Sequence, residues 1–116
     1  MNGCSRVKRV GSLLRREISL VLRDRVKDPR VREVVVTGVD VSEDLRYARA
    51  YVSVMGSPQE QRDAIEGLNR ASRFIRAELG RRLRIRRIPE IAFLRDTSFE
   101  YGAYIEELLR RVRGGG

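Results

Sequence analysis

A run of arginines that no acidic residue interrupts is the segment of the sequence best suited to chemistry. It reads Arg-Arg-Leu-Arg-Ile-Arg-Arg-Ile at positions 81–88, between Gly80 and Pro89. The segment is too apolar for a solvated tail and too charged to lie wholly in a core. We expect its aliphatic residues to anchor it and its guanidinium groups to face a partner. Because guanidinium matches phosphate in charge and geometry, the pattern favours a phosphate backbone as that partner.

Two other segments could contact nucleic acid. One side of a predicted strand carries Tyr47, Arg49 and Tyr51, and aromatic rings interleaved with arginine can stack on bases. A cross-strand aromatic pair is the simpler explanation of these tyrosines. The first predicted helix has a basic face, formed by Arg6, Lys8, Arg9, Arg15 and Arg16. That face fits a partner and a solvated helix surface equally well.

Catalytic chemistry is disfavoured by the residues that the chain lacks. It has no histidine, which is the commonest general base and the commonest metal ligand. Neither of the common glycine-rich phosphate-binding motifs is present. Asp40, Glu43 and Asp44 could hold Mg²⁺, but their turn context favours solvated carboxylates. We therefore predict a protein that is not an enzyme, with no metal site and no cofactor.

The composition fits a small basic globular domain. The chain has 116 residues, of which 41% are hydrophobic, so we expect one domain with a modest core. Its 25 lysines and arginines outnumber 16 acidic residues, which gives a net charge of +9. Such a balance is typical of nucleic-acid binders, although lysine occurs only at positions 8 and 27, so part of the arginine content reflects codon usage. By itself, composition leaves nucleic-acid binding at even odds.

The sequence also predicts a cytoplasmic location. It contains no apolar stretch near the ~20 residues that a membrane span needs. The N-terminus is basic but lacks the continuous apolar region of a secretory signal. Cys4 is the only cysteine, so no disulfide can form within the chain.

The first half of the chain predicts a helix followed by a hairpin. Apolar residues at helical spacing predict a helix from Arg6 to about Val26, ended by Asp28-Pro29. A β-branched run predicts a strand over 34–41, and alternation predicts a second over 47–55, paired antiparallel with the first. The first strand would place residues 35, 37, 39 and 41 on one face and 34, 36, 38 and 40 on the other. In the second, residues 48, 50, 52 and 54 would face inward.

The second half predicts two helices around a third strand. Ser57, Pro58 and Glu60 form a capping box that starts a helix, and Gly80 indicates a frayed end or a C-terminal cap. Residues 91–94 read as a short strand after Pro89. Residues 97–100 are a further capping signal, before a last helix that reaches Val112. The expected fold is α+β, with a three-stranded sheet covered by helices on one face.

Several segments together resemble the ribosome-binding factor A family, in order along nearly the whole chain. The segments that carry the resemblance are Arg6-Val7, Asp28-Pro29-Arg30, Val41-Ser42-Glu43-Asp44-Leu45, Tyr47-Ala48, Tyr51-Val52-Ser53-Val54, Leu68-Asn69-Arg70-Ala71-Ser72, Phe74 to Gly80, Leu83 to Phe93, Asp96 to Gly102, Ile105 and Leu108-Leu109. The resemblance implies a type II KH-like fold of αββααβ order with an added C-terminal helix. It also implies binding to the free 30S small ribosomal subunit and help in late maturation of 16S rRNA, especially in the cold.

The resemblance has one departure with structural meaning. The family lacks the KH G-x-x-G loop and usually has an Ala-x-Gly kink between its two central helices. This sequence has Ala71-Ser72-Arg73 there, so we expect a shallower kink or one at Ser72. Arg73 would then add a phosphate contact where KH domains approach the nucleic-acid backbone.

We predict one KH-like RNA-binding domain over residues 1–116, with about 1–5 and 113–116 flexible, acting as a monomer. The predicted RNA-binding residues are Lys8, Arg9, Arg15, Arg30, Arg73, Arg76, Arg81, Arg82, Arg84, Arg86 and Arg87. The predicted partners are the 30S subunit with its 16S rRNA and, through the last helix, maturation GTPases; no membrane is involved. Two alternatives remain open: a general RNA- or DNA-binding protein, and a protein-interaction module that recruits a GTPase.

Overall fold

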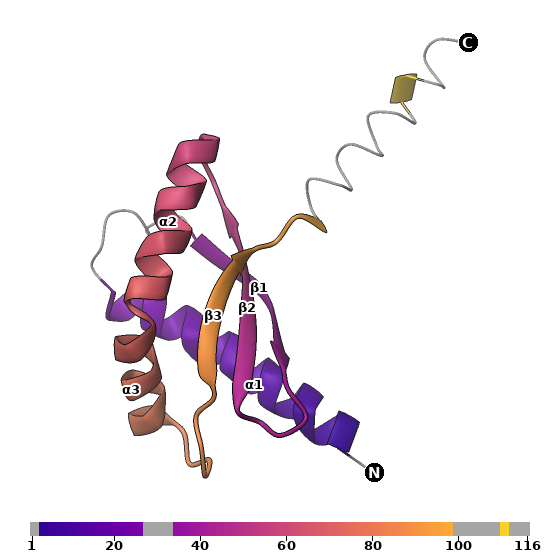
Figure 1. Cartoon of the computed structure of the whole chain (residues 1–116), viewed down its shortest axis with the longest axis vertical. Helices are drawn as coiled ribbons and strands as arrows, with labels where there is room; N and C mark the ends of the chain where they lie inside the picture. The colour runs from indigo at the N-terminus through magenta and orange to yellow at the C-terminus, as the bar shows by residue number, and fades with distance from the viewer. Residues whose placement is uncertain (1–2, 27–33, 99–109, 112–116) are drawn as a thin grey trace.

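A computed structural model of the chain describes residues 3–26, 34–98 and 110–111 (Figure 1). Residues 110–111 are helical, but the rest of the predicted last helix lies outside the described residues. Arg30, the Asp28-Pro29 stop and the glycine-rich end of the chain also lie outside them.

The described elements follow the predicted order. They are α1 (Gly3–Asp24), β1 (Val34–Val41), β2 (Tyr47–Val54), α2 (Pro58–Arg70), α3 (Ser72–Arg82) and β3 (Glu90–Arg95). The first helix begins and ends a little earlier than its apolar spacing predicts. In Figure 1, α1 crosses behind the sheet, while α2 and α3 lie beside β3.

The sheet has the order β1-β2-β3 and mixed strand directions. The short turn after β1 makes β1 and β2 antiparallel, whereas β3 pairs parallel to β2. A parallel partner requires a crossover connection, and α2 with α3 supplies it. The end of this crossover is the arginine run, which therefore enters the sheet at the start of β3.

The core lies between one face of the sheet and the three helices. Its largest fully buried side chains include Phe93 from β3, Leu14 and Ile18 from α1, and Ile75 and Leu79 from α3. The inward side of β2 is formed by small residues, which let the helices approach the sheet closely. Residues on the opposite side, such as Val35 and Leu94, are exposed. The predicted α+β arrangement with helices on one face is confirmed.

A β-bulge makes the predicted alternation of β1 wrong. The pairing with β2 passes from Val36 opposite Val52 to Gly38 opposite Tyr51, so Thr37 is the extra residue. Because the bulge shifts the phase by one, Val36 before it and Val41 after it both face the core. Strict alternation had assigned those two valines to opposite faces. The alternation predicted for β2 is confirmed, since Ala48, Ala50 and Val52 are buried.

The predicted capping box at Ser57 is present, but the helix it starts is interrupted. The Ser57 hydroxyl accepts from the Glu60 amide, and the Glu60 carboxylate accepts from the Ser57 amide. The break falls at Ala71, with φ −84° and ψ 0°, one residue before Ser72. These angles need no glycine. The prediction that Gly80 marks a frayed or capped end is wrong, because α3 continues through it to Arg82.

Gly11 allows the backbone of α1 to approach the backbone of β1 closely. A Cβ atom at this position would lie 2.7 Å from the carbonyl oxygen of Val39 in β1. The obstacle is backbone, which cannot rotate away as a side chain could. A residue without a side chain is therefore needed for α1 to lie at this depth.

We predict that Gly11→Ala destabilises the fold by about 1–2 kcal/mol. Alanine is the better helix former by ~1 kcal/mol, but overpacking of this kind costs about 1–3 kcal/mol. The matched control is Gly80→Ala, where the nearest atom is a side-chain carbon of Ile88 at 3.9 Å. Urea unfolding should show the control unchanged or slightly stabilised. Equal stability of both variants would contradict the close contact.

The bulge residue also ties β1 to the end of β3. The Thr37 hydroxyl lies 2.5 Å from one carboxylate oxygen of Asp96, and the other oxygen accepts from the Ser98 hydroxyl and amide. The Ser98 hydroxyl, followed by that of Thr37, lowers the pKa of the Asp96 carboxyl below its ordinary value. The folded protein therefore holds the charged form of Asp96 in preference to the protonated form.

We predict that this contact weakens in acid. A lowered pKa in the folded state means that the unfolded chain binds more protons, so stability rises with pH through this range. The contribution is fully present above the ordinary carboxyl pKa and is lost as the pH falls through the folded value. Thermal melts of the wild type and Asp96→Asn at about pH 7 and about pH 3 should show a smaller acid-induced drop in the variant. An equal drop would contradict a role for Asp96.

Candidate nucleic-acid interface

The segment of residues 83–89 connects α3 to β3 and is fixed at both ends. The amide of Leu83 bonds to Leu79, which closes α3, and the amide of Glu90 bonds to Arg46, which begins the pairing with β2. Leu83 and Ile88 pack against the core, and Pro89 is fully buried. Arg84, Arg86 and Arg87 are exposed. The predicted anchoring of the run is confirmed for Leu83 and Ile88 but not for Ile85, which does not pack against the core.

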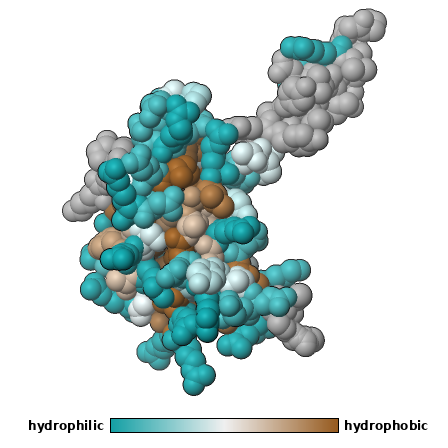
Figure 2. Space-filling view, viewed as in Figure 1, coloured by the Kyte–Doolittle hydropathy of each residue, from teal (hydrophilic) through white to brown (hydrophobic). Residues whose placement is uncertain are grey.

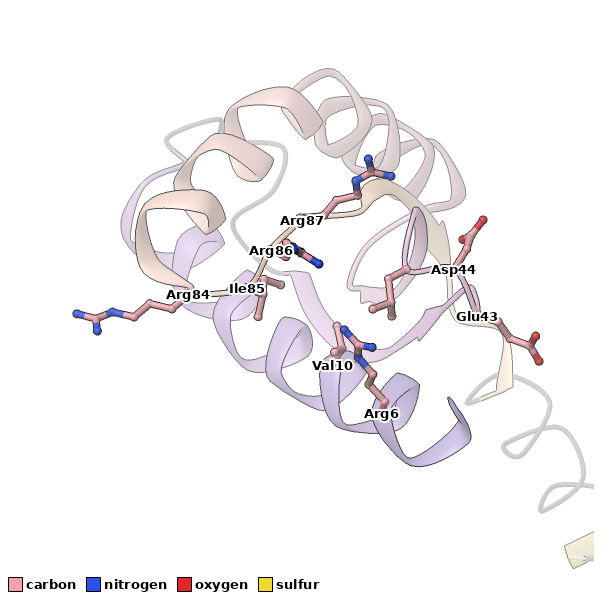
Figure 3. Close-up of a pocket in the computed structure, with 9 residues that line it drawn as sticks. Arg6, Val10, Glu43, Asp44, Arg84, Ile85, Arg86 and Arg87 are labelled. Carbon is pink, nitrogen blue, oxygen red and sulfur yellow. The ribbon is translucent and has the colours of Figure 1, made fainter. Parts of the chain in front are cut away.

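The arginines of this segment border a cavity of about 750 Å³, which we call the arginine cleft. Its walls come from α1, from the turn between β1 and β2, and from the 83–89 segment. The lining residues are Arg6, Val10, Glu43, Asp44, Leu45, Arg84, Ile85, Arg86 and Arg87. Figure 3 shows the guanidinium groups of Arg6 and Arg86 directed into the space between α1 and the segment. Arg84 and Arg87 extend away from it, and the carboxylates of Glu43 and Asp44 point outward from the turn.

The cleft carries an excess of positive charge. Its four arginines make no ion pair with any carboxylate in the described ranges 3–26, 34–98 and 110–111. Hydrogen bonds from the Ser42 hydroxyl and then from the Arg46 amide lower the pKa of the Asp44 carboxyl, so it is ionised at neutral pH. The cleft therefore has a basic wall and an acidic wall, and its four arginines outnumber its two carboxylates.

A second, smaller cavity of about 310 Å³ lies where α2 meets α3, and we call it the junction groove. It is lined by Asn69, Ser72, Arg73, Arg76, Glu90 and Ile91. Arg76 donates to the carbonyl of Ile88 at 3.0 Å, so this groove borders the same 83–89 segment as the arginine cleft. Arg73, which stands where the family usually has glycine, is exposed in the first turn of α3.

Polar side chains in the junction groove complete the outer edge of β3. The Asn69 amide donates to the carbonyl of Phe93 at 3.1 Å, and its oxygen accepts from the Phe93 amide at 2.9 Å. The Ser72 hydroxyl donates to the carbonyl of Ile91 at 2.7 Å. These bonds satisfy backbone groups that face away from β2. They fix the helix junction against β3 and thereby fix the position of Arg73 and Arg76.

Three basic residues act partly in the scaffold. The carboxylate of Glu78, which is only 6% exposed, accepts from Arg81 at 3.1 Å and from Arg25 at 3.5 Å. This buried acid ties the end of α3 to the end of α1. Arg15 lies 3.4 Å from the carbonyl of Val36 and so contacts β1. A role in RNA binding for Arg15 or Arg81 would compete with these contacts.

The structure thus divides the predicted RNA-binding residues among several places. Arg84, Arg86 and Arg87 line the arginine cleft, and Arg73 and Arg76 line the junction groove. Lys8, Arg9 and Arg15 are exposed on α1 outside both cavities, and Arg81 and Arg82 are exposed at the end of α3. Arg30 lies outside the described residues.

Sequence reasoning missed two contributions to this interface. Arg6 was placed on the basic face of the first helix but not among the predicted RNA-binding residues, yet it is the residue of that face that reaches the cleft. Asn69, whose side chain orders the junction groove, carried no signal in the chain's pattern. Its position just before the break between two helices is the one local feature that could have identified it.

The outward face of the sheet remains a weaker candidate. Figure 2 shows hydrophobic residues over the strands, bordered by hydrophilic ones. Tyr47 is 57% exposed and shares this face with Arg49 and Tyr51. Within the described ranges, no helix is long and apolar enough to cross a membrane, and no group of three or more His, Cys, Asp or Glu side chains could hold a metal.

The element order and the mixed three-stranded sheet define a basic α+β domain of the KH-like type. The chain belongs to the ribosome-binding factor A family, whose model matches residues 6–109. Ribosome-binding factor A of Moorella thermoacetica is 48% identical over 113 residues, covering 96% of this chain and 93% of the relative. That of Desulfitobacterium hafniense is 47% identical over 108 residues, covering 93% and 86%.

Solved structures agree with the family assignment. The crystal structure of ribosome-binding factor A from Thermus thermophilus superposes with a TM-score of 0.69 at 29% identity, covering 77% of this chain and 93% of that one. A homology model of the Thermus thermophilus protein, fitted into a cryo-electron microscopy map of its complex with the 30S subunit, gives a TM-score of 0.63 at 30% identity. It covers 75% of this chain and 91% of its own.

We predict that Asn69→Ala destabilises the fold by about 1–3 kcal/mol, because it leaves a backbone donor and acceptor of Phe93 without their partner. Gln59→Ala is the control, since Gln59 bonds only to exposed side chains of its own helix and should change stability by no more than about 0.5 kcal/mol. Chemical denaturation measures both. If Asn69→Ala behaves like the control, the edge of β3 does not depend on this side chain.

Proposed function

We propose that this protein binds the free 30S small ribosomal subunit and assists late maturation of its 16S rRNA. The observation that carries the proposal is the fold likeness to a relative fitted into a 30S complex. The four arginines of the cleft, which make no ion pair within the described ranges, supply a physical basis for contact with rRNA. We propose that the protein acts as a single-domain monomer in the cytoplasm, with maturation GTPases as further partners.

The proposed mechanism is binding without a chemical step. A ligand shifts an equilibrium between two RNA conformations only by its difference in affinity for them. A protein that fits the mature arrangement of the rRNA better than an immature one therefore biases folding toward the mature form. Kinetic barriers between RNA conformations slow interconversion most at low temperature, so this help matters most in the cold.

The arginines that would contact rRNA fall into two groups, one at each cavity. Arg84, Arg86 and Arg87 present their guanidinium groups from a segment whose backbone is anchored at both ends. Arg73 and Arg76 present two more at the edge of β3. Because this backbone is already ordered in the free protein, binding costs less conformational entropy than it would from a flexible loop.

We predict that a triple charge reversal of Arg84, Arg86 and Arg87 to Glu weakens binding to the free 30S subunit on the order of 100-fold. It should also flatten the dependence of binding on salt by about 2–3 in the log–log slope, because each lost phosphate contact removes roughly 0.7–0.9. Co-sedimentation with free 30S subunits and with 70S ribosomes, at several salt concentrations, measures both effects. The wild-type protein should bind free 30S subunits and not 70S ribosomes.

The control reverses Arg23, Arg62 and Arg70, which are exposed outside both cavities. Arg23 and Arg70 make ion pairs, but these are exposed and contribute little to stability. The control changes the net charge equally, so it separates a specific site from general attraction. Arg81 is left unchanged because it neutralises Glu78.

Absence of wild-type binding to either particle would contradict the proposed function. Equal weakening by the two triple variants would remove the 83–89 segment from the interface, and tighter binding to duplex DNA than to 30S subunits would favour the general nucleic-acid binder.

A further inference from the structure

The arginine cleft has an apolar floor that contact with phosphates does not explain. Val10 of α1, Leu45 of the β1–β2 turn and Ile85 of the 83–89 segment line it together, and each is only partly buried. Val10 and Leu45 also pack against the core, whereas Ile85 is not among the residues that do. Ile85 therefore presents aliphatic surface to the cleft from the middle of the arginine run. A surface built only for phosphate would have no use for it.

The backbone of the turn places Leu45 in this floor at an energetic cost. Leu45 has φ +61°, and it is the one residue other than glycine with a positive φ in the described ranges. A branched side chain disfavours that conformation, so neighbouring contacts must hold it. The Ser42 carbonyl accepts from the Leu45 amide, and Asp44 accepts from the Ser42 hydroxyl and the Arg46 amide. The turn is thus locked in a shape that brings a leucine to the cleft.

We propose that the arginine cleft receives one unpaired nucleotide of RNA, with its base against the apolar floor and the guanidinium planes of Arg6 and Arg86. This inference rests on the proposed function and specifies what one part of the surface recognises. Arginine guanidinium groups stack on bases, and aliphatic side chains can cover the remaining face. The cavity of about 750 Å³ is ample for one base with its sugar.

The charges of the cleft set how such a nucleotide lies. Arg84 and Arg87 extend from the outside of the 83–89 segment, where they can hold the flanking phosphates (Figure 3). Glu43 and Asp44 occupy the opposite wall and repel phosphate there. The RNA backbone therefore follows the basic wall, and the base points toward the turn. The same acidic wall disfavours an acidic protein segment, whose carboxylates would be spread along its length.

The nucleotide must be unpaired, because its base can enter the cleft only when it is not stacked inside a duplex. Bases inside an RNA duplex are stacked, and the deep, narrow major groove hides their edges from side chains. A bulged or single-stranded base enters a pocket at little cost in lost stacking. A preference for bulges over plain duplex would also let the protein distinguish rRNA conformations that differ in the pairing of one nucleotide.

The test uses the full chain and three RNA hairpins: one with a single bulged adenosine, one with an abasic sugar at the bulge, and one fully paired. Fluorescence anisotropy at constant salt should show the bulged hairpin bound about tenfold more tightly than the abasic one, as expected for stacking of one base. Ile85→Ser should reduce this ratio toward one while preserving the salt dependence. Arg86→Lys should do the same, because lysine keeps the charge but cannot stack.

Val35→Ser is the matched control, since Val35 is an exposed aliphatic residue on the outward face of the sheet. It should leave the ratio unchanged, and circular dichroism should show that each variant is folded. Equal binding of the bulged and abasic hairpins by the wild type overturns the proposal, as does an unchanged ratio in Ile85→Ser. If 30S binding persists in that case, the proposed function stands without the nucleotide site. Displacement of the hairpins by polyglutamate, with no base preference, would assign the cleft to an acidic protein segment instead.

Discussion

The free edge of β3 is the constraint on which the arrangement of this surface depends. Among the described residues β3 has a strand neighbour on one side only, so the backbone groups of Ile91 and Phe93 that face the other way need partners. The helix junction provides them through Asn69 and Ser72. Because these bonds run from side chain to backbone, they hold the two helices in a fixed register along the strand. The position of α3 and of the 83–89 segment, and therefore of their arginines, depends on this register.

The second determinant is the depth at which α1 lies on the sheet. Gly11 allows the helix backbone to approach Val39, and the N-terminal turns of α1 then run past the turn that carries Leu45. Arg6 consequently meets the 83–89 segment across the cleft, although about 80 residues separate them in sequence. The acidic residues determine which arginines are free to bind. Glu78 neutralises arginines at the ends of α1 and α3, whereas the cleft arginines lack such a neighbour in the described ranges.

The parts of this fold that depend on local pattern could be predicted from the sequence. The capping box at Ser57, the inward alternation of β2 and the anchoring of the arginine run by Leu83 and Ile88 each follow from neighbouring residues. The bulge at Thr37 could not be predicted, because it depends on how β1 pairs with β2 and not on the β-branched character of the run. The prediction at Gly80 was wrong because it relied on local propensity alone. Glycine weakens a helix, but the packing of the buried Leu79 keeps α3 helical through this position.

The candidate site was predictable in kind but not in composition. The run from 81 to 88 identified a basic surface, and all five arginines of the run proved to be exposed. Which of them share a cavity depends on elements far along the chain, so Arg6 could be found only in three dimensions. Likewise, the buried acid that binds Arg81 gives no local sign of its role.

Because the cleft arginines make no ion pair in the described ranges, added salt should stabilise the free protein while it weakens the binding of RNA. Like charges held close together repel, and this repulsion disfavours the compact state of the free protein when little salt is present. Added salt screens the repulsion and so steadies the unbound fold, while the same ions compete for phosphate and loosen a complex with RNA. A polyanion that settles on the cleft removes the repulsion directly. Such a ligand would act as a folding cofactor for the very segment that binds it.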